Sequence, residues 1–204
     1  MKFSLGTAQF GLDYGVANID GMVEPKEVTA ILAQAARYGI EILDTAAAYG
    51  QSESVLGLAG VDKFMLVSKL PCLPEKTTNI ERWVGNMVAG SLQRLGVSNL
   101  YGLLVHKPSD LFGKQGADLI RALYGLKADG IVQKIGVSVY NPTVLADVTR
   151  LIDVDLIQAP MNVLDNELAS SGWLDELKDR NVEIHCRSLF LQGLLLMPRK
   201  KIPH

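Results

Sequence analysis

The sequence is poor in the residues that hold small or metal-dependent proteins together. It has 2 cysteines and 3 histidines among 204 residues, and neither Cys72 nor Cys186 has a CxxC or His-rich partner nearby. A disulfide scaffold or a zinc site requires paired cysteines or clustered ligands. We therefore expect free thiols, no bound metal and a reducing, cytoplasmic environment.

The sequence also lacks an excess of charge and any long apolar run. Its 20 Lys and Arg are balanced by 22 Asp and Glu, for a formal net charge of −2. A nucleic-acid-binding protein would show a basic stripe, and a membrane span needs roughly 18 consecutive apolar residues. The composition thus favours a globular protein that binds a small neutral or anionic molecule, with no nucleic acid and no membrane as partner.

Short β-rich apolar runs alternate with longer segments of helical period. Most of the runs are apolar on both faces, as strands buried in a parallel sheet are. The expected strands cover residues 3–8, 40–44, 64–68, 101–106, 134–138, 155–159 and 182–187. No Ser-, Gly- or Pro-rich linker divides them, so residues 1–204 are expected to form a single domain.

The helical segments carry start and stop signals. Pro25 opens the first and Gly39 can end it, while a capping box of Thr78 and Glu81 opens the second, which ends near Gly96. Further helices are expected at residues 118–129, 142–152 and 167–180.

Two folds fit this alternation, an open doubly wound sheet and a (β/α)8 barrel. An open sheet usually binds its ligand on a glycine-rich first turn, whereas a barrel gathers groups from several strand ends around one mouth. The first turn, GTAQFGLDYG, contains no GxGxxG motif, and ionisable residues recur at successive strand ends. We therefore predict an α/β protein with a (β/α)8 TIM barrel. Because the sequence shows seven strands, the last β/α unit is expected to be lacking in this chain.

Four ionisable residues fall at or after three consecutive strand ends. Asp44 ends the run ILD and Tyr49 follows five positions later, Lys69 comes directly after the next strand, and His106 closes the run YGLLVH. Each alone has an ordinary structural explanation, such as loop capping, packing or solvation. Their joint pattern predicts a site, because the strand ends of a barrel converge on one rim.

The chemistry of these four groups suits proton delivery to a ketone or aldehyde oxygen. A lysine ammonium with little access to water needs an anionic partner, for which Asp44 is the candidate. A cation beside Tyr49 should lower the pKa of its phenol from about 10 toward the range of a general acid. His106, as a neutral imidazole, could orient the carbonyl through a ring N–H.

The sequence resembles the aldo-keto reductase family along nearly its whole length. The resemblance lies in LGTAQFG, GIEILDTAAAYGQSESVLG, VSKL, SLQRLGVSNLYGLLVHKP, ALYGLKADGIVQKIGVSVYN, LIQAPMNVLD and VEIHCRSLFLQGLL, in the family's order and spacing. It implies a (β/α)8 barrel and an oxidoreductase that reduces carbonyl compounds to alcohols with NAD(P)H. By this resemblance Tyr49 gives the proton, Lys69 and Asp44 adjust the acidity of Tyr49, and His106 orients the substrate.

The cofactor positions of the family match less completely. By the resemblance, Ser138 and Gln158 hold the nicotinamide carboxamide, Gly193 lies in the loop that approaches the pyrophosphate, and NADP(H) is favoured over NAD(H). Val139 stands where the family usually has asparagine. Arg187 stands where it commonly has a tyrosine under the nicotinamide. The Arg187 guanidinium could stack on that ring or pair with a carboxylate, and both alternatives stay open.

The length of the chain bears on its partners. A barrel of this kind has about 250 residues, and this chain has 204. We expect that the residues belong to a longer natural protein; the alternatives are that another chain closes the gap or that the isolated chain is only marginally stable. The predicted partner is a small-molecule carbonyl substrate, and the chain is expected to be a monomer unless unpaired barrel edges associate.

Other function classes also fit parts of the sequence. The departures at Val139 and Arg187 and the lacking last unit fit a non-catalytic nicotinamide-binding or interaction protein on a reductase-like scaffold. Lys69 could serve a Schiff-base lyase, which Asp44 opposes by keeping the amine protonated. Metallohydrolases and glycosidases are disfavoured, because the histidines lack ligand spacing and Asp44 is the only clear strand-end carboxylate.

Overall fold

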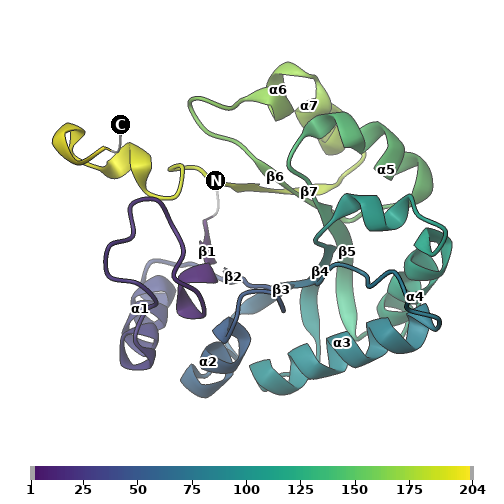
Figure 1. Ribbon diagram of the computed structural model, residues 1–204, viewed down its shortest axis with the longest axis horizontal. Coiled ribbons are helices and arrows are strands. Elements are labelled where there is room, and N and C mark those ends of the chain that lie inside the picture. Colours follow the sequence, from purple (N-terminus) through teal and green to yellow (C-terminus); the bar gives the residue numbers. More distant parts are fainter. Residues whose placement is uncertain (1–2, 203–204) are drawn as a thin grey trace.

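A single parallel sheet curls around a common interior, and the helices lie on its outer side (Figure 1). This computed structural model describes residues 3–202 of the chain. The seven strands in that range are β1 (Ser4–Gly6), β2 (Ile42–Asp44), β3 (Met65–Leu70), β4 (Leu100–Val105), β5 (Val132–Ser138), β6 (Leu156–Pro160) and β7 (Glu183–Arg187). All seven strands predicted from the sequence are confirmed, with small shifts at their ends.

The strands stand in sequence order, and each pairs with the next in parallel. In the described residues β1 pairs only with β2 and β7 only with β6, so the sheet is a curled, open part of a barrel and a closed eight-stranded barrel is not seen. Parallel order requires a crossover after each strand, and such crossovers carry the helices to one side. Every carboxyl end therefore faces the same rim.

Beside five short 3-10 helices, seven α-helices occur among residues 3–202. They are α1 (Pro25–Arg37), α2 (Ser52–Ala59), α3 (Ile80–Leu95), α4 (Gly116–Ala128), α5 (Leu145–Leu151), α6 (Glu167–Ser170) and α7 (Trp173–Asp179). No helix in this range is both long and apolar enough to cross a bilayer. Helix α2 was not expected from the sequence, because its apolar period covers only 8 residues.

Three predicted helices differ from the structure, and the one expected at 142–152 begins as a 3-10 helix and is α-helical only from Leu145. The cap of α3 is Asn79, whose side chain accepts a hydrogen bond from Arg82 N at 2.8 Å, so the predicted cap at Thr78 is wrong by one residue. Asn and Thr are both good caps, and the backbone register decides between them. The single helix predicted for 167–180 is two helices, broken at Gly172 with φ of 84°. That left-handed backbone cannot continue an α-helix.

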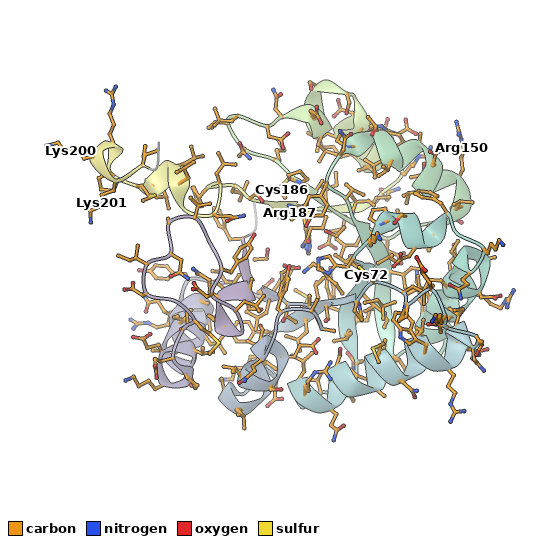
Figure 2. The ribbon with its side chains drawn as sticks, viewed as in Figure 1. Cys72, Arg150, Cys186, Arg187, Lys200 and Lys201 are labelled. Atoms are coloured by element: carbon orange, nitrogen blue, oxygen red, sulfur yellow. The ribbon has the colours of Figure 1, made fainter. Side chains whose placement is uncertain are left out.

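The two cysteines lie apart as free thiols, as Figure 2 shows. Cys72 is exposed in the loop after β3, and Cys186 is half-buried on β7. The Cys186 sulfur lies 3.7 Å from that of Met161.

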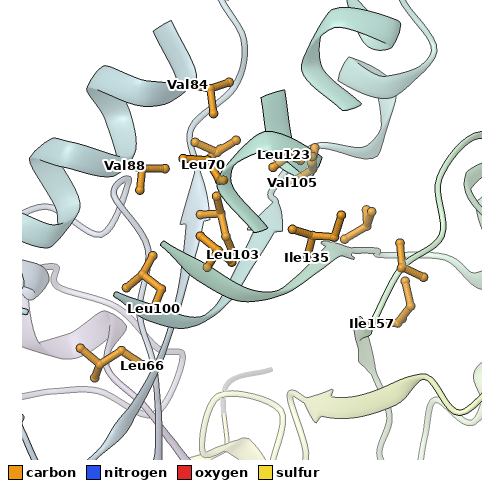
Figure 3. Packing of buried hydrophobic residues seen from close by; sticks show 14 of the residues in the cluster. Leu66, Leu70, Val84, Val88, Leu100, Leu103, Val105, Leu123, Ile135 and Ile157 are labelled. Carbon is orange, nitrogen blue, oxygen red and sulfur yellow. The ribbon is translucent and has the colours of Figure 1, made fainter. Parts of the chain in front are cut away.

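Alternation along the strands separates the core from the site. On β3, Leu66 and Leu70 pack in the large cluster between the sheet and the helices (Figure 3), whereas Val67 packs in a smaller cluster inside the curl with Leu104 and Leu156. Side chains two apart share a face of a strand. Lys69 comes two positions after Val67, so its side chain also lies on the inner side of the sheet, near the carboxyl end of β3.

A second polar cluster lies inside the curl, nearer the amino ends of the strands. The Tyr101 hydroxyl donates to Glu183 Oε2 at 2.6 Å, and Lys134 Nζ donates to the Tyr101 hydroxyl at 2.8 Å and ion-pairs with Glu183. His185 Nε2 lies 2.7 Å from Glu183 Oε1. We call Tyr101, Lys134, Glu183 and His185 the inner cluster; it ties β7 to β4 and β5 across the interior.

Candidate active site

Six of the eight residues singled out from the sequence lie on or beside the carboxyl ends of successive strands. The other two, Tyr49 and Gly193, lie in the loops after β2 and β7. Asp44 ends β2, Lys69 is on β3, His106 follows β4, Ser138 ends β5, Gln158 is on β6 and Arg187 ends β7. The parallel order brings these ends to one rim, which we call the mouth.

Asp44 and Lys69 form a buried ion pair. Lys69 Nζ donates to Asp44 Oδ1 at 2.8 Å, to Asp44 Oδ2 at 2.9 Å and to the Thr45 carbonyl at 2.8 Å. The Lys69 side chain is fully buried and that of Asp44 is 15% exposed. Burial lowers the pKa of Lys69, and the Asp44 carboxylate opposes this effect. Three acceptors satisfy the ammonium, so Lys69 is held as a fixed charge rather than as a free amine.

Tyr49 lies against this pair, in the loop between β2 and α2. Lys69 Nζ is 4.8 Å from the centre of its ring. Contrary to the sequence expectation, the pKa of Tyr49 is raised, because burial and the Asp44 carboxylate together outweigh the Arg187 guanidinium. Asp44 neutralises Lys69, so little of the lysine charge is left to favour a phenolate. Tyr49 is therefore held in its protonated form.

His106 completes the group and lies beside Tyr49. The two rings meet edge to face, with centres 6.0 Å apart and planes at 80°. Burial lowers the pKa of His106, and the Lys69 charge lowers it further. The imidazole is thus neutral near pH 7 and keeps one N–H to donate, in the form expected for an orienting residue.

Ser138 and Gln158 connect directly to the ion pair. Ser138 Oγ donates to Gln158 Oε1 at 3.2 Å, and Gln158 Nε2 donates to Asp44 Oδ1 at 2.7 Å. The amide thereby adds a neutral donor to the carboxylate that already holds Lys69. Sequence reasoning placed these residues near a cofactor but did not anticipate this link across the interior, because it joins strands that are not neighbours.

Arg187 enters the mouth from β7 (Figure 2). Its guanidinium donates to the Val139 carbonyl at 3.1 Å and to Ser188 Oγ at 3.4 Å, and its Cζ lies 4.2 Å from the centre of the Tyr140 ring. Among residues 3–202 no carboxylate pairs with it. Of the two alternatives, pairing with a carboxylate is therefore not seen.

Gly193 lies in a loop that packs against the loop after β1. Its φ is 89°, and an added Cβ would come within 2.7 Å of the Ala17 Cβ. The preceding residue, Gln192, accepts from Ala17 N through its carbonyl and from Val16 N through its side chain, both at 3.2 Å. The backbone N–H groups of Gln192 and Gly193 have no acceptor among residues 3–202. Gly193 is thus required by the loop packing, and two donors there remain available to a ligand.

Two buried polar networks behind the site escaped the sequence analysis. Ser52 Oγ donates to the Thr7 carbonyl at 2.9 Å and shares hydrogen bonds with the hydroxyls of Thr7 and Thr45, which fixes the turn whose carbonyl binds Lys69. Glu53 accepts from Ser68 at 2.6 Å and from Arg94 at 2.7 and 2.9 Å. The adjacent Ser and Glu in GQSES were a signal, because such polar residues in an otherwise apolar helix need partners.

Comparison with known proteins assigns this arrangement. A curled parallel sheet with ionisable groups gathered at its carboxyl edge is the architecture of barrel enzymes. The chain belongs to the Aldo/keto reductase family, whose model matches residues 2–203. It is similar to a D-threo-aldose 1-dehydrogenase from Pseudomonas sp., with 28% identity over 232 residues, 96% of this chain and 70% of that protein.

Solved structures agree on the fold. The glycerol dehydrogenase AKR11B4 from Gluconobacter oxydans is 26% identical with a TM-score of 0.71, covering 98% of this chain and 64% of that one. An aldo/keto reductase from Klebsiella pneumoniae in complex with NADP and acetate has 20% identity and a TM-score of 0.74, over 93% of this chain and 64% of that one. The family and the names of these relatives support an oxidoreductase.

Proposed function

We propose that this chain reduces aldehydes or ketones to alcohols with a nicotinamide cofactor, and that Tyr49 gives the proton. The observation that carries the proposal is the convergence of a buried ion pair, a protonated tyrosine and a neutral histidine at one mouth. A tyrosine that stays protonated at neutral pH is a proton donor in the state the reaction needs.

In the proposed reaction, one residue donates the proton and the others orient the substrate or hold the proton donor in position. Tyr49 O–H donates to the carbonyl oxygen of the substrate, and a His106 N–H donates to the same oxygen. Asp44 holds Lys69 in place beneath the Tyr49 ring, and this ion pair fixes the position from which Tyr49 gives its proton. Because the tyrosine, the lysine and the carboxylate are already in contact, little reorganisation is required during the reaction.

The donor set at the mouth fits an amide-bearing cofactor. Asn162 Nδ2 is buried without a hydrogen-bond partner in the described part of the chain, in the loop after β6. With Ser138, Gln158 and Arg187 it offers donors and acceptors of the kind a carboxamide binds, while the Gln192 and Gly193 amides suit a phosphate. The cofactor would supply the hydride. We propose NADP(H) as the cofactor in preference to NAD(H), and the Klebsiella relative was solved in complex with NADP.

The test separates chemistry from binding. Tyr49→Phe removes the acidic hydrogen and keeps the ring, so NADPH binding should persist while turnover with a panel of aldehydes and ketones falls at least about 100-fold. Unchanged turnover in Tyr49→Phe would remove Tyr49 from the mechanism. If wild type binds NADPH but none of the carbonyl compounds in the panel leads to its oxidation, the chain is a non-catalytic nicotinamide-binding protein instead.

A further inference from the structure

Arg187 brings an unneutralised positive charge to the mouth. Its partners are the Val139 carbonyl, the Ser188 hydroxyl and the Tyr140 ring, none of which carries a charge. Lys69, by contrast, is neutralised by Asp44 at 2.8 Å. His106 is neutral and Tyr49 is protonated. The Arg187 guanidinium therefore leaves a net charge of one positive unit on the set formed by Asp44, Tyr49, Lys69, His106 and Arg187.

This charge reaches the proposed proton donor and its neighbours. Burial is the largest influence on the pKa of Tyr49, Lys69 and His106, and Arg187 acts on each as an additional influence that lowers it. In all three cases the guanidinium disfavours positive charge or favours negative charge. Any further cation that enters this mouth meets the same repulsion.

The reaction places such a charge there. The hydride and the proton must reach the two ends of one carbonyl group, so the hydride-bearing ring has to bind within a substrate's width of Tyr49. A reduced nicotinamide ring is uncharged, and the oxidised ring carries one positive charge. We propose that Arg187 makes the site bind the reduced cofactor in preference to the oxidised one. This inference rests on the proposed function, and it adds a redox-state preference that the reaction itself does not require.

The expected size follows from the charges. Two unit charges about 8 Å apart, in a medium between water and protein interior, change a binding constant about five- to tenfold. Contacts that both forms share, such as those to the phosphates, cancel in the ratio of the two dissociation constants. The ratio Kd(NADP⁺)/Kd(NADPH) therefore reports the effect of the guanidinium charge.

The experiment measures this ratio with the full 204-residue chain. NADPH is titrated by its fluorescence and NADP⁺ by displacement, in wild type, Arg187→Gln, Arg187→Lys and Arg150→Gln. Gln keeps a donor for the Val139 carbonyl and removes the charge, whereas Lys keeps the charge. Arg150 is exposed, pairs with Asp147 and points away from the mouth (Figure 2), so its variant controls for net charge. The ratio should fall about five- to tenfold in Arg187→Gln and stay within about twofold in the other two.

The outcomes distinguish the two proposals. An unchanged ratio in Arg187→Gln, or an equal fall in Arg187→Gln and Arg187→Lys, overturns the charge-based preference and leaves the proposed function standing. Failure of wild type to bind either form overturns both. Should Arg187→Gln not fold, a salt series on wild type decides. Screening should bring the ratio closer to one as ionic strength rises, and a constant ratio above one overturns the inference.

Discussion

The two sides of the mouth are built differently. On the side of β2 to β4, the site residues lie on or just after strands that are mostly buried, and five of the six residues of β3 are buried. On the side of β7, all five strand residues are only partly buried. Lys69 is held by three acceptors, one of them a carbonyl and two from a carboxylate, whereas Arg187 is held by one carbonyl, one hydroxyl and the face of a ring.

The backbone after β7 adds to the difference. Ser188, Leu191 and Gln192 adopt positive φ without being glycine, and Phe190 and Leu196 expose most of their apolar side chains. Such conformations cost energy and persist where the surroundings hold them or where function uses them. The comparison indicates that Lys69, beneath the proposed proton donor, is fixed by burial and by three acceptors, while Arg187 and the loop after β7, which are proposed to meet the cofactor, are lightly held. Breaking contacts on each side tests this directly.

The largest effect is expected from the buried ion pair. Asp44→Ala leaves the Lys69 ammonium buried without its anion, which should lower the free energy of unfolding by about 3–5 kcal/mol. Urea unfolding at pH 7 measures it. Asp147→Ala removes an exposed carboxylate paired with Arg150 and should cost under about 0.5 kcal/mol. Similar losses in the two variants would contradict the account of a buried, strongly coupled pair.

A matched pair of leucines compares packing on the two sides. Leu103 on β4 is 2% exposed within the main cluster, and Leu196 in the segment after β7 is 68% exposed. Leu103→Ala should cost about 2–5 kcal/mol, and Leu196→Ala should stay within about 0.5 kcal/mol. Thermal or urea unfolding measures both changes. A cost above about 1.5 kcal/mol at Leu196 would show that the segment after β7 is held more firmly than its exposure indicates.

The site residues on the side of β2 to β4 could also be predicted from the sequence better than the contacts on the side of β7. The strands, their parallel order and the gathering of Asp44, Lys69 and His106 follow from apolar runs with polar ends, because burial on both faces leaves a clear pattern. The raised pKa of Tyr49 could not be foreseen, since it depends first on how deeply the ring is buried and then on the Asp44 carboxylate beside it. The partners of Arg187 are a carbonyl, a hydroxyl and an exposed ring, which no spacing rule indicates.

Local propensity explains the smaller misses. Helix α2 is short and carries Ser52 and Glu53 on its buried side, so its apolar period is weak. These residues are buried because Thr7, Thr45, Ser68 and Arg94 satisfy them from other elements. Long-range pairing of this kind is invisible to reasoning from sequence neighbours, and it overrides the preference of polar side chains for the surface.

The loops after β1 and β7 pack against each other at the mouth, and a change at this contact should lower the free energy of unfolding by an intermediate amount. Gly193→Ala places a side chain at φ of 89° and within 2.7 Å of the Ala17 Cβ. The free energy of unfolding should fall by about 1–2 kcal/mol. Ala17→Gly removes the atom that the new side chain would approach. Gly193→Ala should therefore cost less stability in the Ala17→Gly background than in wild type. Additive losses would show that backbone strain, and not the approach to Ala17, requires the glycine.

The smallest effect concerns the inner cluster, which anchors the weakly buried strand β7. Burial alone would raise the pKa of Glu183, but hydrogen bonds from Lys134, Tyr101 and His185 outweigh it and lower the pKa to about 2. Because the folded-state pKa lies below the unfolded value, the carboxylate stabilises the fold above about pH 4.5 and loses this contribution as the pH falls toward about 2. The Glu183 side chain is only partly buried, so solvent screens these contacts and we expect under about 1 kcal/mol.

Glu183→Gln should therefore be slightly less stable than wild type at pH 7 and approach it as the pH falls from about 4.5 to about 2. Urea unfolding at matched ionic strength measures the difference across that range. A difference that stays constant with pH would mean that the substituted amide loses packing and hydrogen-bond geometry rather than charge. The anchor of β7 would then be steric, and the contrast between the two sides of the mouth would no longer include their electrostatics.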